Sequence, residues 1–144
     1  METQLTLTPI STNITLPNLR LFTFRGVSVY LEAVVCRITA PRLESLKIRL
    51  FKQLAFSVPR LPQFMNTTEN LRFDNAEIRF KDKETHVLMA LGETDTYAFI
   101  VTVDCWHLDW QVSCMARICT ALSPVFSAVE RLTLRQEEIG RAHV

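Results

Sequence analysis

The alternation of apolar and polar residues predicts short strands separated by helices. Residues 4–8, 16–24 and 43–50 alternate with the period of a half-buried strand. Residues 28–38 instead carry apolar side chains at i, i+3, i+4 and i+7, which places them on one face of a helix. Pro41 is predicted to end this helix, because the residue before a proline avoids the helical region. The segment 16–50 is therefore predicted to form strand, helix, proline turn and strand.

Two of these strands belong to units that repeat at a fixed distance along the chain. Four positions of the first unit match four of the second, each 24 residues later: Pro17, Leu19, Phe22 and Phe24 align with Pro41, Leu43, Leu46 and Ile48. A period of about 20–29 residues with this leucine spacing is typical of leucine-rich repeats, whose helices are buried by stacking of neighbouring units. A looser third unit is predicted to end in a strand at 69–73.

Beyond the third unit the repeat pattern gives way to other elements. Residues 76–91 contain two alternating segments joined by a charged turn, and we interpret them as a β-hairpin inserted where a repeat helix would lie. Residues 97–103 are dense in β-branched and aromatic residues, as in a buried strand. Residues 109–122 carry an apolar stripe at helical spacing. The segment 129–134 then repeats the leucine pattern once more.

These elements together predict an α/β fold. We expect a short, irregular leucine-rich-repeat-like solenoid with parallel strands, helices on one face and an inserted β-hairpin, forming one domain over residues 1–136. Residues 137–144 are predicted to be a non-native tail, since Ile139–Val144 resembles one reading frame of a common sequencing adapter. The domain is therefore expected to be a fragment of a longer chain.

Composition narrows the classes of function. The net charge of +1 gives no support for nucleic-acid binding, which needs a clustered basic face. No stretch approaches the ~18 unbroken apolar residues of a membrane-spanning helix, so no membrane partner is expected. The N-terminus lacks the pattern of a signal peptide, which predicts an intracellular protein, cytoplasmic or nuclear. The four cysteines form no Cys-x-x-Cys pair and are expected to be buried thiols.

A longer likeness extends over four blocks of the chain, 16–32, 40–46, 63–67 and 103–112. These blocks resemble the leucine-rich region of fungal (basidiomycete-type) F-box-like proteins, and the resemblance covers about residues 5–135. In that family an N-terminal F-box docks on the adaptor of a cullin-RING ubiquitin ligase, and the repeat domain is expected to hold a protein substrate. No compact helical segment precedes residue 16, so the resemblance implies the adaptor as a partner only if an F-box lies upstream in the full chain.

The densest group of chemically active side chains lies at 104–109, with a cysteine, a histidine and two aspartates. No second Cys or His pair follows at the spacing of a zinc site. We therefore favour a structural role, in which the nearby tryptophans pack at a strand-to-helix corner and His107 donates a hydrogen bond. Cys114 and Cys119 lie on or beside the apolar helix stripe, where burial raises a thiol pKa. The sequence thus predicts no enzyme, no cofactor and no metal.

The outward-facing strand positions are the best candidates for binding a partner, because solenoids bind through extended concave faces. The alternative is an ordinary solvated sheet face. The predicted partner-binding residues are Arg20, Glu44, Lys47, Arg49, Arg72, Asp74, Glu130, Arg131 and Arg135.

The predicted function is that of a protein–protein interaction module, the substrate-recognition region of an F-box-like ubiquitin-ligase subunit with an unknown protein substrate. The alternative is a truncated repeat fragment with no independent function. Such a fragment would expose unpaired strand edges and uncapped apolar faces, which repeat domains tolerate poorly.

Overall fold

The computed structural model describes residues 13–51, 57–92, 96–105 and 108–137, in which strands alternate with helices. The chain order is β1 (Ile14–Thr15), β2 (Leu21–Gly26), α1 (Ser28–Val35), β3 (Ile38–Thr39), β4 (Ser45–Leu50), α2 (Leu61–Asn66), β5 (Asn75–Phe80), β6 (Glu84–Ala90), β7 (Phe99–Asp104), α3 (Leu108–Ala121), α4 (Ser123–Phe126) and β8 (Arg131–Gln136). None of these helices is long and apolar enough to cross a membrane.

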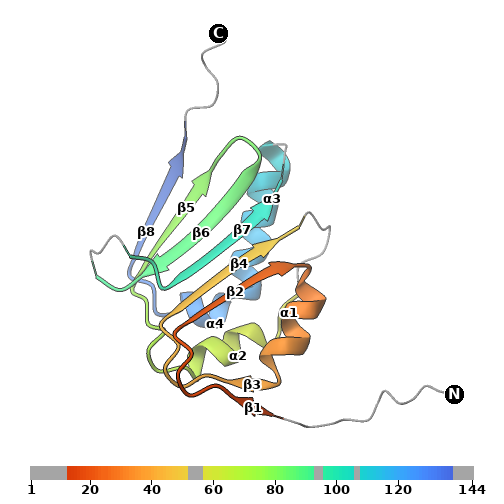
Figure 1. Ribbon diagram of the computed structural model, residues 1–144. Helices are drawn as coiled ribbons and strands as arrows, with labels where there is room; N and C mark the ends of the chain where they lie inside the picture. The colour runs from red at the N-terminus through yellow and green to blue at the C-terminus, as the bar shows by residue number, and fades with distance from the viewer. Residues whose placement is uncertain (1–12, 52–56, 93–95, 106–107, 138–144) are drawn as a thin grey trace, which may run out of the picture.

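Six strands form one mixed sheet in the order β2-β4-β7-β6-β5-β8 (Figure 1). Strands β2, β4 and β7 are parallel, and β5 and β8 are parallel. Strand β6 is antiparallel to both of its neighbours, β7 and β5. Strands β1 and β3 form a separate parallel pair beside the sheet.

The prediction of a parallel leucine-rich-repeat solenoid is wrong. A solenoid adds each strand beside the previous one, whereas β7 rather than β5 lies beside β4. The three-residue connection between β5 and β6 permits only an antiparallel return. Strand β6 then pairs with β7 on its other side, so the predicted hairpin is present but belongs to the sheet instead of replacing a helix.

The 24-residue offset is confirmed for the first two units, because it equals the register of two strand pairs. Phe24 lies opposite Ile48 in the β2–β4 pair, and Ile14 lies opposite Ile38 in the β1–β3 pair. The predicted third strand at 69–73 is wrong. With β7 occupying the place beside β4, this segment has no strand to pair with, and it is an irregular connection whose leucine and phenylalanine are buried.

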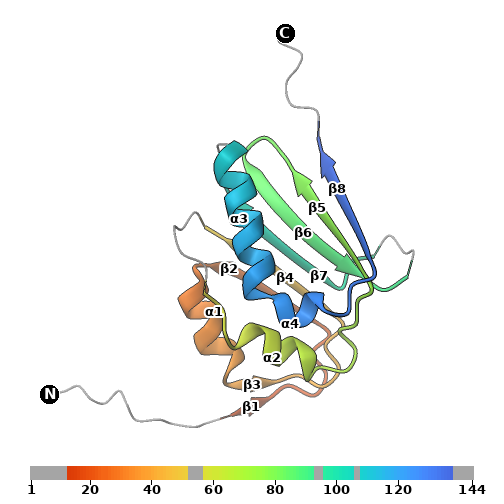
Figure 2. The same ribbon diagram turned by 180° about the vertical axis from the view of Figure 1, so that it is seen from behind.

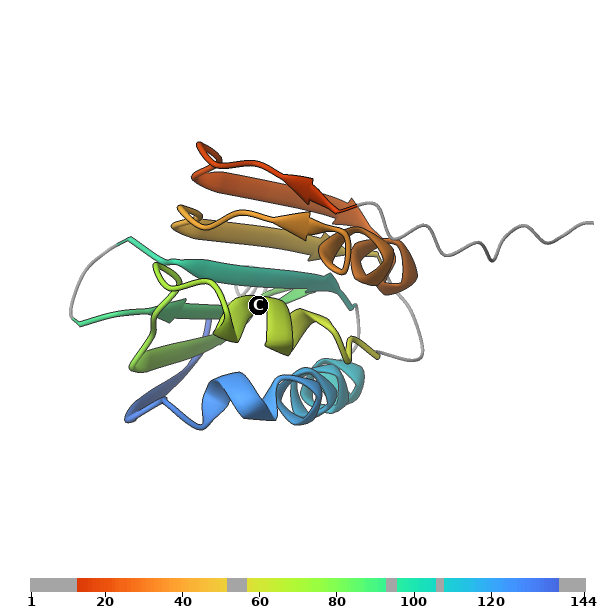
Figure 3. The same cartoon turned by 90° about the horizontal axis from the view of Figure 1, so that it is seen from below.

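All four helices lie on one face of the sheet (Figure 2), and from below α2 lies between α1 and α4 (Figure 3). Alternate residues of β4, β5, β6 and β7 point at the helices and form the core, for example Leu46, Ile48 and Leu50 of β4, all 2% exposed or less.

The apolar stripe predicted for residues 109–122 includes Val112, Met115, Cys119 and Leu122, and it is confirmed in part. Leu122 is buried, and Met115 and Cys119 pack against the core. Val112, however, is 46% exposed, and Gln111 is buried instead.

Candidate interaction surface

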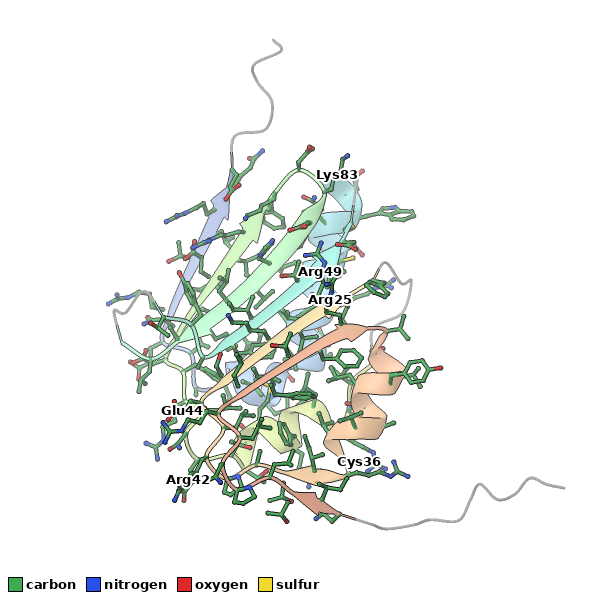
Figure 4. The ribbon with its side chains drawn as sticks, viewed as in Figure 1. Arg25, Cys36, Arg42, Glu44, Arg49 and Lys83 are labelled. Atoms are coloured by element: carbon green, nitrogen blue, oxygen red, sulfur yellow. The ribbon has the colours of Figure 1, made fainter. Side chains whose placement is uncertain are left out.

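The face of the sheet opposite the helices is open, and Figures 1 and 4 look onto it. Because strand side chains alternate, the residues between the core positions point to this face. We call these residues the open face: Leu21, Thr23 and Arg25 of β2, Ser45, Lys47 and Arg49 of β4, Ile100, Thr102 and Asp104 of β7, Glu84, His86, Leu88 and Ala90 of β6, Asn75, Glu77 and Arg79 of β5, and Arg131, Thr133 and Arg135 of β8.

The central feature of the open face is an arginine held between two carboxylates. Arg49 Nη2 donates to Glu84 Oε2 at 2.7 Å and to Asp104 Oδ1 at 2.8 Å, so one guanidinium joins β4, β6 and β7. The hydrogen bond to Glu84 is the main cause that raises the pKa of Arg49. Desolvation acts to raise the pKa of Glu84, but hydrogen bonds from Arg49 and His86 outweigh it and lower that pKa. The cluster therefore stabilises the charged forms of Arg49 and Glu84.

His86 extends this cluster toward a hydroxyl group. Its Nε2 lies 2.6 Å from Glu84 Oε1, and its Nδ1 lies 3.4 Å from Thr102 Oγ1. A carboxylate, an imidazole and a hydroxyl in series are the parts of a nucleophilic triad. Thr102, however, is only 6% exposed and lies within β7, whose backbone is paired on both sides. The backbone amides around Thr102 are hydrogen-bonded within the sheet and form no oxyanion hole. The arrangement therefore suits the positioning of these side chains rather than catalysis.

A second cluster lies toward the β8 edge. Arg79 Nε donates to Glu77 Oε2 at 2.7 Å, and Arg135 Nε lies 3.3 Å from the same oxygen. The Tyr97 hydroxyl donates to Glu77 Oε1 at 3.1 Å, and the Arg79 guanidinium lies 5.8 Å from the Tyr97 ring centre. The hydrogen bond from Arg79 is the largest effect on the pKa of Glu77, which is lowered. One carboxylate thus organises two arginines and a tyrosine.

The open face has an excess of positive charge. Its basic residues are Arg25, Lys47, Arg49, Arg79, Arg131 and Arg135, and its acidic residues are Glu77, Glu84 and Asp104. Arg25 lies directly opposite Arg49 in the β2–β4 pair, and Figure 4 shows the two side by side. Within the described part of the chain, neither Arg25 nor Lys47 forms an ion pair. Their charges are therefore available to an acidic partner.

The structure divides the nine predicted partner residues into two groups. Lys47, Arg49, Arg131 and Arg135 lie on the open face. The other five lie outside the strands, at the end of the sheet where the parallel strands begin: Arg20, Glu44, Arg72, Asp74 and Glu130. Of these, Asp74 and Glu130 border the open face, because they line a pocket together with Asn75 and Arg131. The residues just before each strand do not follow the alternation within it, and the expected solenoid arch is not formed. The binding role of all nine residues stays a prediction.

The second group forms a rim with its own contacts. Arg20 Nη1 lies 3.9 Å from Glu44 Oε2, and Glu44 and Arg72 line one shallow pocket. Asp74 and Glu130 line another, and the Asp74 carboxylate accepts a hydrogen bond of 2.8 Å from the Gly92 amide. These contacts order the loops at the start of the strands.

Sequence reasoning missed most of the residues that organise the open face, among them Glu77, Arg79, Glu84 and His86. Their alternation with apolar neighbours was a usable signal, but it gave no indication that β6 lies near β4. Asp104 was considered only for metal or catalytic chemistry, and it is an ion-pair partner of Arg49.

The structure describes the segment 104–109 only in part. Cys105 is buried, while His107 and Trp106 lie outside the described residues. Among the residues that the structure describes, no group of three His, Cys, Asp or Glu side chains is placed to hold a metal. The prediction of four buried thiols is confirmed only for Cys105. Cys36 is exposed just after α1, and Cys114 and Cys119 are half-buried.

Comparisons of the chain with protein-family models, with curated proteins and with solved structures found no match.

Proposed function

We propose that this chain is a protein–protein interaction module that binds an acidic surface of its partner through the open face. The observation that carries the proposal is the excess of basic residues on a sheet face that the helices leave uncovered. Complementary charge steers encounter and suppresses wrong partners more than it adds affinity. The paired clusters around Arg49 and Glu77 would provide a fixed surface, and Arg25 and Lys47 would provide the available charge.

The test is binding of a fluorescently labelled acidic peptide, measured by anisotropy at low salt. The double variant Arg25→Gln, Lys47→Gln is expected to bind about fivefold more weakly, since each exposed ion pair contributes roughly 0.5 kcal/mol. The control variant Arg42→Gln, Arg60→Gln removes the same charge from positions outside the open face. Equal weakening by both variants would show general charge attraction and would reject the open face as the site.

The resemblance to F-box-like proteins supports a more specific role for this module, as the substrate-recognition region of a ubiquitin-ligase subunit. The adaptor of a cullin-RING ligase is part of this proposal only if the full chain carries an F-box upstream. Sequencing the complete transcript on both sides of the reading frame provides the first test. If an F-box is encoded, the full protein should co-purify with the adaptor; if the frame contains none, the ligase role loses its support.

The alternative is a fragment with no independent function. It is favoured by one observation: every residue of strand β8, at the edge of the sheet, is exposed. The two possibilities differ in how the chain unfolds: an interaction module should unfold in one cooperative transition, and a fragment should not.

A further inference from the structure

Strand β8 is an edge strand that presents apolar side chains to solvent. It pairs with β5 on one side, and within the described residues no strand lies along the other. Leu132 and Leu134 point to the helix side of the sheet, like their neighbours Ala76 and Ile78, yet they are 56% and 58% exposed. Ala76 and Ile78 are buried. The apolar layer of the sheet therefore continues onto β8 without a cover.

The backbone of β8 also has unused hydrogen-bonding groups. The amides of Arg131 and Glu137 donate to the carbonyls of Asp74 and Phe80 at 3.2 and 3.0 Å. In a parallel pair, only every second residue of a strand forms backbone hydrogen bonds with a given neighbouring strand. The odd-numbered residues of β8 therefore form the hydrogen bonds to β5. Leu132, Leu134 and Gln136 then direct their N–H and C=O groups away from the sheet. Unpaired edges of this kind are templates for another strand.

We propose that β8 pairs with β8 of a second copy of this chain, antiparallel about a two-fold axis at Leu134. In antiparallel pairs, residues that exchange both hydrogen bonds lie directly opposite each other, so the three outward residues must face one another. With Leu134 opposite its own copy, Leu132 lies opposite Gln136, and all outward groups of both strands are used. The two sheets join into one, and four leucines meet on the helix side.

The charges of the strand favour this register over the adjacent register, in which the two-fold axis lies at Thr133. With Leu134 on the axis, Arg131 lies opposite Glu137 of the second copy, and this pair occurs twice. Shifting the axis to Thr133 places Arg131 opposite Arg135 twice and places Gln136 opposite Glu130, whose amide already donates to the Asp74 carbonyl. Opposite charges directly across a strand pair are stabilising and like charges are destabilising. Within one copy, Glu137 Oε2 already lies 3.7 Å from Lys81 Nζ. Because both side chains are partly exposed, this ion pair is weak and does not prevent Glu137 from also pairing with Arg131 of the second copy.

The dimer would enlarge the proposed binding surface, although the pairing itself does not depend on the proposed function. A two-fold axis through an antiparallel strand pair is perpendicular to the sheet, so both open faces point to the same side. Two basic faces on one surface would bind an extended acidic partner with avidity, provided that it spans both. If the acidic peptide does not bind, the proposal of a dimer is unaffected. If the chain is monomeric, the proposal that the open face binds an acidic partner is unaffected.

The test is sedimentation of the full 144-residue chain over a range of concentrations. The chain is expected to form dimers, and Arg131→Glu is expected to raise the dissociation constant about tenfold, because two attractive pairs become repulsive. The double variant Arg131→Glu, Glu137→Arg restores the pairs with exchanged signs and should recover dimerisation. Leu134→Pro, which removes an outward amide while leaving the bonds to β5, should also give monomers. Arg25→Gln, on the opposite edge strand, should leave the dimer unchanged.

Three results would overturn the proposal. The first is a monomer at every concentration up to about 1 mM, where a complex of ~4 kcal/mol would be half formed. The second is a dimer that Arg131→Glu and Leu134→Pro both leave intact, provided that circular dichroism shows both to be folded. The third is a series of species larger than dimers, which indicates open-ended addition of β8 to the other sheet edge.

Discussion

At the scale of single residues, Arg49 makes the most consequential polar contacts of the open face. Its two carboxylate partners come from strands far away in the sequence, and all three side chains are roughly one-third exposed. Solvent therefore screens part of the attraction, but removing the arginine leaves two carboxylates facing each other.

Arg49→Met is expected to lower the free energy of unfolding by about 1–2 kcal/mol at pH 7, the value of a charged hydrogen bond reduced for exposure. Urea denaturation measures this change. Lys47→Met, in the same strand but without an ion-pair partner among the described residues, should cost less than about 0.5 kcal/mol. Equal effects of the two variants would contradict the structural role of Arg49.

The same cluster predicts how stability depends on pH. The pKa of Glu84 is lower in the folded protein than its usual value of 4.5, so its contribution is fully present above that value. It is lost as the pH falls through the lowered pKa, because the carboxylate must be protonated. Between pH 5 and pH 3, wild type should lose more stability than Arg49→Met, measured by urea denaturation at each pH. Parallel pH profiles would argue against the linkage.

A third residue predicts a gain in stability. Thr85 is completely buried on the helix side of β6, and its hydroxyl has no hydrogen-bond partner among the described residues. Its neighbours across the sheet, Phe80 and Val103, are apolar. Thr85→Val keeps the shape and removes an unsatisfied group, so it should stabilise the protein by about 1 kcal/mol in thermal or urea unfolding. The control Thr85→Ser should destabilise it, since it keeps the hydroxyl and deletes a buried methyl group.

At the scale of elements, Gln111 connects helix α3 to the hairpin. Its side chain is 3% exposed, and its Nε2 donates to the carbonyls of Lys81 at 2.8 Å and Cys105 at 2.9 Å. Gln111→Ala leaves both carbonyls without this donor and should cost about 1–3 kcal/mol in urea unfolding. Val112→Ala, at the neighbouring exposed position, serves as the control and should cost well under 1 kcal/mol. A Gln111 variant as stable as the control would show that the helix is held by apolar packing alone.

The elements also show how far the sequence could predict the fold. The offset of 24 residues predicted the register of β2 and β4, because both units carry the same alternation and the same proline turn. The turn between β5 and β6 predicted an antiparallel hairpin. Neither pattern indicates which strand lies beside β4, since strand order depends on contacts between distant segments.

The same limit applies to the candidate site. Arg49 and Lys47 were identified from alternation within one strand, whereas Glu84 and Asp104 reach Arg49 across 35 and 55 residues of sequence. Local periodicity contains no information on such pairs. The residues just before the strands, such as Glu44 and Asp74, were placed on the same surface only because a regular solenoid was assumed.

At the scale of the whole molecule, one core joins both halves of the sheet. Buried residues from the β2–β4 half and from the hairpin half belong to a single cluster beneath the helices. A shared core predicts a single cooperative transition in thermal and chemical unfolding, with coincident far-ultraviolet and fluorescence signals. A broad or two-step transition would favour the alternative of a fragment without independent function.

The position of β7 has a consequence for the speed of folding. The β2–β4 unit and the β5–β6 hairpin are each built from contacts close in sequence, whereas β7 must bring Phe99 beside Leu46 to unite them. Closing so long a loop costs entropy before any contact offsets it, so this pairing is expected to limit the folding rate. Truncating Val101 in β7 should therefore slow refolding, while truncating Phe24 in β2 should mainly accelerate unfolding. Similar refolding rates for the two variants would show that the halves unite after the rate-limiting barrier.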